Sequence, residues 1–250
     1  MCCSFLAAGK TVAVWPAAVP GAPVLYLNAA AGEGEAVRAA LQARRPGAYS
    51  LVCVSGLDWG HDLTPWGCPP PFRGADPFTG GADGYLRLLA QEILPAAESR
   101  LPGPPCWRGL GGYSLAGLFA LYALYRTPLF ARIASVSGSL WYPGLMEFLA
   151  AREPAVPPQR LYFSIGRKED RTRNPLLQPG RANTEAIAAA FAGRGVQTKF
   201  ELNPGTHFTD PAARTAAGLA GCWGAERPLY KAFTHISPGD GGRARRPLLQ

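Results

Sequence analysis

The feature that most constrains the fold of this chain is the alternation of short apolar runs with helical patterns along its length. The apolar runs predict β-strands at Val24–Asn28, Tyr49–Ser55, Trp107–Gly111, Ile133–Ser137, Arg160–Ile165 and Gln197–Leu202. The patterns between them predict helices at Gly34–Arg44, Ala82–Leu101, Leu115–Tyr125, Thr184–Gly195 and Pro211–Leu219. This order predicts an α/β fold, in which helices cover both faces of a mostly parallel central sheet.

The composition fits one such domain. Of the 250 residues, 48% are hydrophobic and 17% are charged, which is enough to bury a sizeable core and excludes wholesale disorder. We expect the domain to span residues 1–224. Residues 225–250 differ, because they have little periodicity and five Lys or Arg against two Asp or Glu. We interpret them as a basic, loosely ordered tail.

The net charge of +8 raises nucleic acid or an anionic surface as a partner. The tail alone contributes +3, so the rest of the chain carries 8 − 3 = +5. Those basic residues are scattered and match no nucleic-acid-binding motif, so we expect no nucleic acid partner. Oligomeric state is not readable from the sequence.

We expect neither a membrane span nor a metal site. The long uncharged stretch from Thr11 to Gly32 is broken by three prolines, and the stretch from Gly109 to Tyr125 is too short to span a bilayer. The six cysteines form no CxxC pair. The start MCCSFLAAGK lacks the basic region of a secretory signal, so we expect a cytoplasmic protein with reduced thiols.

The strongest chemical signal is the segment from Gly112 to Gly117, GYSLAG, between a predicted strand and a predicted helix. It fits the nucleophile elbow, in which a serine stands on a sharp turn between small residues. The turn crowds backbone against backbone, so the flanking positions must be small, and Ala116 is a mild departure from the usual glycine. Ser114 is therefore the candidate nucleophile. The alternative is a Gly-rich turn whose serine merely caps a helix.

A serine nucleophile needs a base, and the chain has three histidines. His207 lies in the loop NPGTHFTDP, after the last predicted strand and before a helix, which makes it the candidate base. The acid that orients a histidine could be Glu169 or Asp170, both in the loop GRKED after the strand LYFSI. A charged, solvated loop is the plain alternative. The chain order serine, acid, histidine is that of α/β-hydrolases.

Two backbone N–H groups are candidates for an oxyanion hole. Leu115 follows the serine at a helix N-terminus, and Ala29 lies in the loop after the strand VLYLN. The tryptophans of the loops are candidates for the walls of a substrate pocket, and we expect Trp59 and Trp141 to be substrate-binding residues.

Several segments together resemble the esterases of the enterochelin-esterase/esterase-D group of α/β-hydrolases. They are LDWGHDLTPW, GGYSLAGLFALYALYRTPLFARIASVSGSLWYPG, LYFSIGRKEDRTRNP and FELNPGTHFTDPAARTAAGLAGCW. The resemblance covers about Val12 to Trp223. It implies the α/β-hydrolase fold and a serine esterase acting on a small-molecule ester without a metal or cofactor.

Residue by residue, the resemblance implies Ser114 as nucleophile, His207 as base and Glu169 as acid, with Asp170 the alternate. The competing hypothesis is a catalytically idle binding protein with the same fold.

Overall fold

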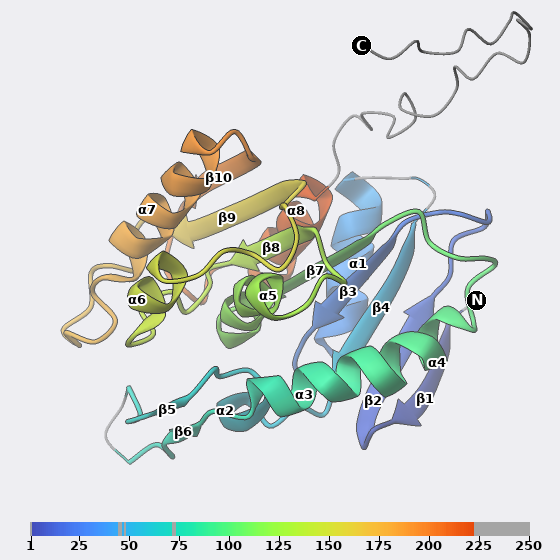
Figure 1. Cartoon of the computed structure of the whole chain (residues 1–250), viewed down its shortest axis with the longest axis horizontal. Coiled ribbons are helices and arrows are strands. Elements are labelled where there is room, and N and C mark those ends of the chain that lie inside the picture. The colour runs from blue at the N-terminus through green and yellow to red at the C-terminus, as the bar shows by residue number, and fades with distance from the viewer. Residues whose placement is uncertain (1, 45–46, 48, 72–73, 223–250) are drawn as a thin grey trace, which may run out of the picture.

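The structure is a computed structural model, which describes residues 2–44, 47, 49–71 and 74–222. Its centre is an eight-stranded sheet of order β1-β2-β4-β3-β7-β8-β9-β10 (Figure 1). The strands are β1 (Cys3–Ala7), β2 (Lys10–Trp15), β3 (Val24–Asn28), β4 (Ser50–Ser55), β7 (Arg108–Tyr113), β8 (Arg132–Val136), β9 (Arg160–Gly166) and β10 (Gln197–Asn203).

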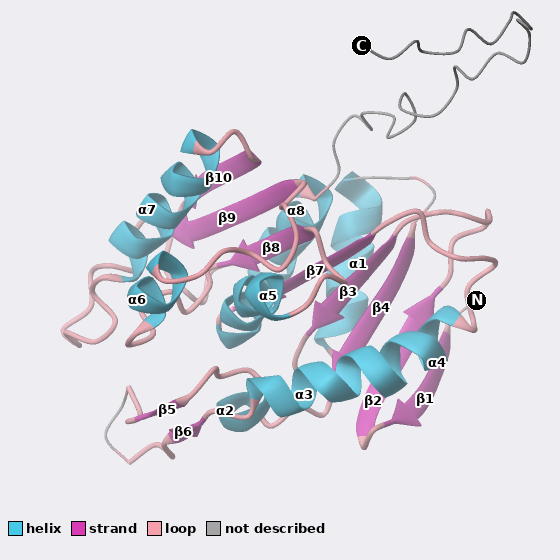
Figure 2. Ribbon diagram, viewed as in Figure 1, coloured by secondary structure: helices cyan, strands magenta, loops and turns pink. Residues whose placement is uncertain are grey.

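The sheet is mostly parallel, as predicted. All neighbouring strands from β4 across to β10 are parallel, and the arrowheads of β8 and β9 point the same way in Figure 2. Strands buried on both faces carry continuous apolar runs, and all five residues of β3 are buried. The carboxyl ends of β7, β8, β9 and β10 therefore lie side by side at one edge of the sheet.

The strands β1 and β2 form an antiparallel hairpin at the sheet edge that the sequence did not predict. Ala8 and Gly9 make its two-residue turn with φ of 52° and 72°. Tight hairpin turns of this kind are usually marked by Asn-Gly or Asp-Gly. An Ala-Gly turn gives a weaker signal, because alanine rarely adopts a positive φ.

Helices cover both faces of the sheet. One face packs against α1 (Glu33–Arg44) and α8 (Pro211–Gly221), which also contact each other. The opposite face packs against four helices that lie in front of the sheet in Figure 1. They are α3 (Ala82–Leu88), α4 (Leu94–Glu98), α5 (Leu115–Arg126) and α7 (Gly180–Gly193). The predicted fold class is confirmed.

The helix predicted at Ala82–Leu101 is observed over residues 82–98 and contains a π-helical turn, Leu89–Ile93. The Leu94 N–H donates to the Leu89 carbonyl, five residues back rather than four. Pro95 follows at once. Proline has no N–H to donate and its ring crowds the carbonyl four residues earlier, so the wider turn relieves a clash that a regular helix would suffer.

The loop predicted over Gly56–Gly81 contains short elements: α2 (Trp59–Asp62) and the strands β5 (Gly67–Cys68) and β6 (Phe78–Thr79). The sequence also did not predict α6 (Leu145–Ala150). The strands β5 and β6 pair only with each other, as a small second sheet. The predicted tail at residues 225–250 lies outside the described residues.

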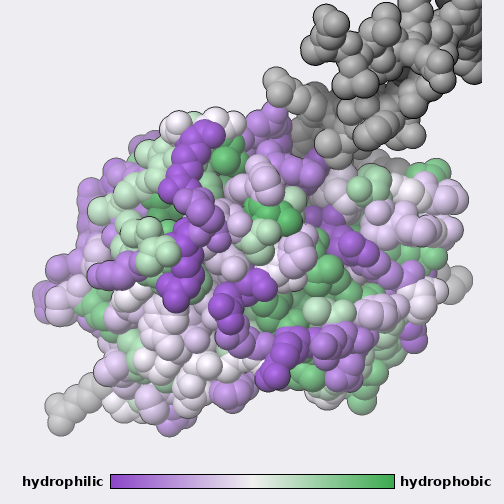
Figure 3. Space-filling model, viewed as in Figure 1, coloured by the Kyte–Doolittle hydropathy of each residue, from purple (hydrophilic) through white to green (hydrophobic). Residues whose placement is uncertain are grey.

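In the described part of the chain no helix is both long and apolar enough to cross a membrane. On the face seen in Figure 3, polar and apolar residues are interspersed over the surface.

Candidate functional site

The segment GYSLAG forms a sharp strand-to-helix turn. Ser114 joins β7 to α5 in a backbone conformation, φ 59° and ψ −122°, that L-residues seldom adopt. A Cβ added to Gly112 would lie 2.8 Å from the carbonyl carbon of Ala116, so the turn requires glycine there. The Ala116 methyl is fully buried at this contact, and it fits because Gly112 has no side chain.

The strained turn is held by backbone hydrogen bonds. The Ser114 N–H donates to the Val136 carbonyl at 3.1 Å, and the Ser114 carbonyl accepts from the N–H groups of Gly117, Leu118 and Ser139. These bonds tie the elbow to the end of the neighbouring strand β8 and to the first turn of α5. The serine side chain is thereby fixed at the carboxyl edge of the sheet.

The structure brings Ser114, His207 and Glu169 together in one hydrogen-bonded row. His207 Nε2 lies 3.1 Å from Ser114 Oγ, and His207 Nδ1 lies 2.8 Å from Glu169 Oε2. The three residues follow β7, β10 and β9 respectively, so the parallel strands deliver them to one place although they are far apart in sequence. This is the geometry that a serine nucleophile, its base and an orienting acid require.

The loops that carry the histidine and the acid are bound to each other. The Arg167 N–H donates to the Asn203 carbonyl at 2.8 Å, and the Lys168 N–H donates to the Gly205 carbonyl at 3.0 Å. A Cβ on Gly166 would lie 2.8 Å from both Glu169 Oε1 and the Gly205 oxygen, so this close approach also needs glycine.

The Glu169 carboxylate is buried and saturated with donors. Besides His207, it accepts from the Gly166 N–H at 2.6 Å and from the Ser137 hydroxyl at 2.9 Å. Burial by itself raises the pKa of Glu169, but the hydrogen bond and charge of His207, with the Gly166 and Ser137 bonds, outweigh it and hold the pKa below its ordinary value. Glu169 is therefore an anion and a pure acceptor at neutral pH.

Asp170, the alternate acid, faces away from the histidine. Its Oδ2 lies 3.3 Å from Arg181 Nη1, and its side chain is one-third exposed. Of the two carboxylates that the sequence left open, Glu169 is the one in contact with His207.

Of the two N–H groups predicted as oxyanion donors, only that of Leu115 lies at the site without a partner in its own helix. Leu115 is the first residue of α5 and borders the cavity at Ser114, so its N–H has no partner one turn back in its own helix. The prediction for Ala29 is wrong, because its N–H donates to the Val54 carbonyl at 3.1 Å. Asn28 pairs with Val54 in the parallel ladder, and Ala29 continues that ladder by one more bond. The next N–H, of Ala30, donates to a Glu33 carboxylate.

A cavity of about 340 Å³ opens beside the Ser114 hydroxyl. Its walls are mainly apolar and come from several loops and from the ends of β6, α5 and β9: Pro71, Phe78, Leu115, Trp141, Ile165, Leu177 and Phe208. Trp141 is in the wall, as predicted. The prediction for Trp59 is wrong: it lies in α2, packs against the main hydrophobic core and does not border this cavity.

The sequence did not predict three residues of this site. Ser139 lines the cavity with its hydroxyl 3.3 Å from Ser114 Oγ. Ser137 donates to Glu169 from a backbone with φ of 42°. Arg214 is a buried cation that lies 3.4 Å from Glu169. The run VSGS at the end of a predicted strand was a weak signal for the serines, whereas nothing local distinguishes Arg214 from a surface arginine.

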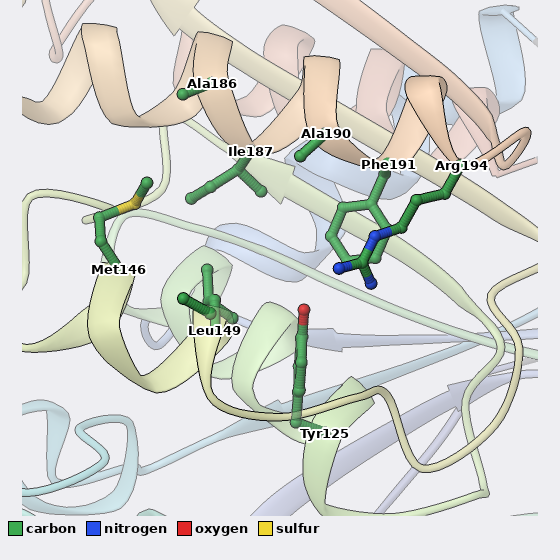
Figure 4. A pocket seen from close by; sticks show the side chains of 9 residues that line it. Tyr125, Met146, Leu149, Ala186, Ile187, Ala190, Phe191 and Arg194 are labelled. Atoms are coloured by element: carbon green, nitrogen blue, oxygen red, sulfur yellow. The ribbon is translucent and has the colours of Figure 1, made fainter.

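A second cavity, of about 260 Å³, lies between α5, α6 and α7 (Figure 4). Tyr125, Ile187 and Phe191 contribute to its largely apolar lining, and the Arg194 guanidinium at one end pairs with Glu153 at 2.9 Å. None of the predicted site residues borders it, so the chemistry described above belongs to the first cavity.

Comparisons with known proteins agree on the fold and the family. A family model described as "Putative esterase" matches residues 29–210. Among curated proteins, the uncharacterized protein YbbA of Bacillus subtilis is 26% identical over 167 residues, a match that covers 64% of this chain and 66% of that protein. The chain thus matches slightly less than two thirds of the length of this relative.

Solved structures with the same fold include three hydrolases. An IroE-like serine hydrolase from Shewanella oneidensis superposes with a TM-score of 0.70 at 21% identity, over 84% of this chain and 74% of that one. A siderophore hydrolase, EstB, from Aspergillus nidulans gives 0.62 at 21% identity, over 89% and 94%. Enterochelin esterase from Shigella flexneri gives 0.63 at 22% identity, over 89% and 56%.

Proposed function

This chain belongs to the Putative esterase family, and on that premise we propose that it is a serine hydrolase that cleaves carboxylic esters through an acyl-enzyme at Ser114. The observation that carries the proposal is the hydrogen-bonded row of Ser114, His207 and Glu169. The row ends in a cavity large enough for a small-molecule ester.

The protonation states follow from the anionic acid. Because the Glu169 carboxylate only accepts hydrogen bonds, the proton between it and the imidazole resides on His207 Nδ1. His207 Nε2 then carries a lone pair toward the Ser114 hydroxyl at 3.1 Å. This is the tautomer that can accept the serine proton.

In the first half-reaction, Ser114 Oγ attacks the ester carbonyl carbon while His207 Nε2 takes the hydroxyl proton. The resulting imidazolium is stabilised by Glu169, and it protonates the alcohol oxygen as the C–O bond of the ester breaks. In the second half-reaction, water gives a proton to His207 and attacks the acyl-enzyme. Ser114 regains its proton as the carboxylic acid leaves.

The tetrahedral intermediates need hydrogen-bond donors for their oxyanion. We assign the Leu115 N–H as one donor, because it lies at the N-terminus of α5, where the helix dipole also favours negative charge. The Ser139 hydroxyl is the second candidate, in place of the Ala29 N–H. It is 2% exposed, lines the cavity and lies within hydrogen-bond distance of Ser114 Oγ.

The cavity favours an uncharged ester. Among the described residues of its lining, Glu169 and His207 are the only ionisable side chains. Each ligand methylene that is buried against the aromatic and aliphatic walls contributes about 0.8 kcal/mol to binding. We therefore expect kcat/KM on p-nitrophenyl esters to rise about 4-fold for each added acyl methylene until the cavity is filled. An anionic acyl group such as a hemisuccinate should be a poor substrate.

The decisive experiment is Ser114→Ala, assayed on p-nitrophenyl butyrate, with labelling by a fluorophosphonate probe. We expect activity to fall by at least roughly 10³-fold and labelling to disappear, while the circular dichroism spectrum stays the same. An unlabelled wild-type protein would favour the competing hypothesis of an idle binding protein. Retained hydrolysis in Ser114→Ala would refute the assignment of the nucleophile.

A further inference from the structure

A buried guanidinium lies directly behind the row of Ser114, His207 and Glu169. Arg214 belongs to the first turn of α8, and its side chain is only 5% exposed. A buried arginine is costly unless its donors and its charge are satisfied. The partners that satisfy it show what this residue holds together.

The guanidinium binds the loop that carries the histidine. Arg214 Nη1 donates to the Thr206 carbonyl at 3.0 Å, and Nη2 donates to the Pro204 carbonyl. Thr206 is the residue immediately before His207. Arg214 therefore fixes the backbone from which the imidazole projects.

The same guanidinium also reaches the acid. Arg214 Nη1 lies 3.4 Å from Glu169 Oε1, the carboxylate oxygen that is not bonded to His207. It also lies 3.3 Å from the Tyr113 hydroxyl, and that hydroxyl donates to the His207 carbonyl at 2.7 Å. One planar group thus connects the end of β7 with the loops after β9 and β10.

This role needs arginine rather than any cation. The guanidinium is planar and holds its N–H donors in a fixed arrangement, so Nη1 and Nη2 together can contact the acid and the histidine loop at the same time. A lysine ammonium at this depth would keep the charge but would not span Glu169 and the Pro204 carbonyl together.

We propose that Arg214 is a positioning residue of the ester-hydrolysis reaction, which sets the distance and angle between Glu169 and His207 by clamping the histidine loop to the acid. The inference rests on the proposed function. Arg214 does not border the cavity, so it acts on the rate of the chemical step and not on substrate binding.

The structure predicts a specific kinetic signature. Without the clamp the imidazole loses its fixed position relative to Glu169 and Ser114, and misplacement of a catalytic group by about 1 Å can cost 10²-fold in rate. We expect Arg214→Met to lower kcat on p-nitrophenyl butyrate about 10²-fold with KM within 2-fold of wild type. Arg214→Lys should recover part of the loss and stand about 10-fold below wild type.

The matched control is Leu219→Ala, a fully buried change in the same helix that destabilises the fold without touching the site. It should leave kcat within 2-fold at a temperature where the variant is folded. Proton NMR gives a second readout: the downfield signal of the His207 Nδ1 proton should shift or broaden in Arg214→Met and remain in Leu219→Ala.

The outcomes separate the two proposals. If Ser114→Ala abolishes hydrolysis but Arg214→Met keeps the wild-type kcat and the wild-type Nδ1 signal, the positioning role is refuted and the esterase assignment stands. If Arg214→Met raises KM and leaves kcat unchanged, Arg214 acts on binding and the inference is equally wrong. Should Arg214→Met not fold, Arg214→Lys carries the test, and a wild-type kcat in that variant overturns the proposal.

Discussion

The substitution Glu169→Gln tests the electrostatic arrangement of the site most directly. Glu169 Oε2 accepts from His207 Nδ1 at 2.8 Å, while Oε1 accepts from the Gly166 N–H, the Ser137 hydroxyl and Arg214. A glutamine of the same shape has one oxygen and one NH₂ group. Its oxygen must face the three donors, so its NH₂ must face His207.

An NH₂ group opposite Nδ1 forces the wrong tautomer. His207 would accept at Nδ1 and carry its proton on Nε2, pointing at the Ser114 hydroxyl that it should deprotonate. In serine hydrolases with an Asp, this amide substitution costs about 10⁴-fold in kcat. That loss corresponds to about 5.4 kcal/mol of activation free energy. We expect a loss of this size for Glu169→Gln, with KM little changed.

The same substitution leaves the Arg214 charge buried without its anion. Breaking a buried ion pair by removing one partner costs about 3–5 kcal/mol. We therefore expect the free energy of unfolding in urea to decrease by an amount in the lower part of that range. The loss is limited because the Pro204 and Thr206 carbonyls still accept hydrogen bonds from Arg214.

The control is Asp170→Asn, one residue away. Asp170 pairs with Arg181 near the surface, at 3.3 Å and with about one-third of its side chain exposed, so we expect kcat within 2-fold of wild type. The assay is steady-state hydrolysis of p-nitrophenyl butyrate by both variants at pH 7. A greater loss for Asp170→Asn than for Glu169→Gln, or more than a tenth of wild-type kcat in Glu169→Gln, would refute the assignment.

Three other measurements test the turn, the cavity wall and the acid. Gly112→Ala should destabilise the protein by roughly 1–3 kcal/mol in thermal melts and slow fluorophosphonate labelling, because the added methyl collides with the backbone of Ala116. The control Gly84→Ala places its methyl in open space on α3 and should be neutral or stabilising. Phe208→Ala should raise KM roughly 5-fold, which corresponds to about 1 kcal/mol, and leave kcat unchanged, because this 86% exposed residue borders the cavity. The control Leu6→Ala removes a side chain of β1 that is 76% exposed, and it should change neither constant. The pKa of the Glu169 carboxyl is lower in the folded state than its ordinary value of 4.5, so its ionisation stabilises the fold fully above pH 4.5. The extra stability of wild type over Glu169→Gln should therefore shrink as the pH falls through the folded-state pKa. An increase in this difference on acidification would contradict the argument.

Much of the fold was predictable from local patterns. Strands buried on both faces are rich in apolar residues, and the segments that form β3, β4, β8 and β9 have that character. The β1–β2 hairpin was missed because it lies at the sheet edge, where the residues of β1 alternate between partly buried and exposed, and because its Ala-Gly turn lacks the usual signal. The helix α6 was missed because it is only six residues long.

The sequence alone was enough to predict the part of the candidate site that depends on local geometry. A serine between small residues, after a strand and before a helix, can form an elbow without help from distant parts of the chain, so Ser114 and the Leu115 N–H were predictable. The scarcity of histidines then favoured His207.

Only the tertiary structure decided the choices that depend on direction and on distant partners. Glu169 and Asp170 are neighbours in a turn, and which of them meets His207 depends on how the loops after β9 and β10 bond to each other. The Ala29 N–H does not take its predicted role because it donates to the Val54 carbonyl of β4. The role that we propose for Arg214 depends on its contact with Glu169, which the packing of α8 provides. A side chain's type is local, but its hydrogen-bond partners come from strands and loops brought together by the fold.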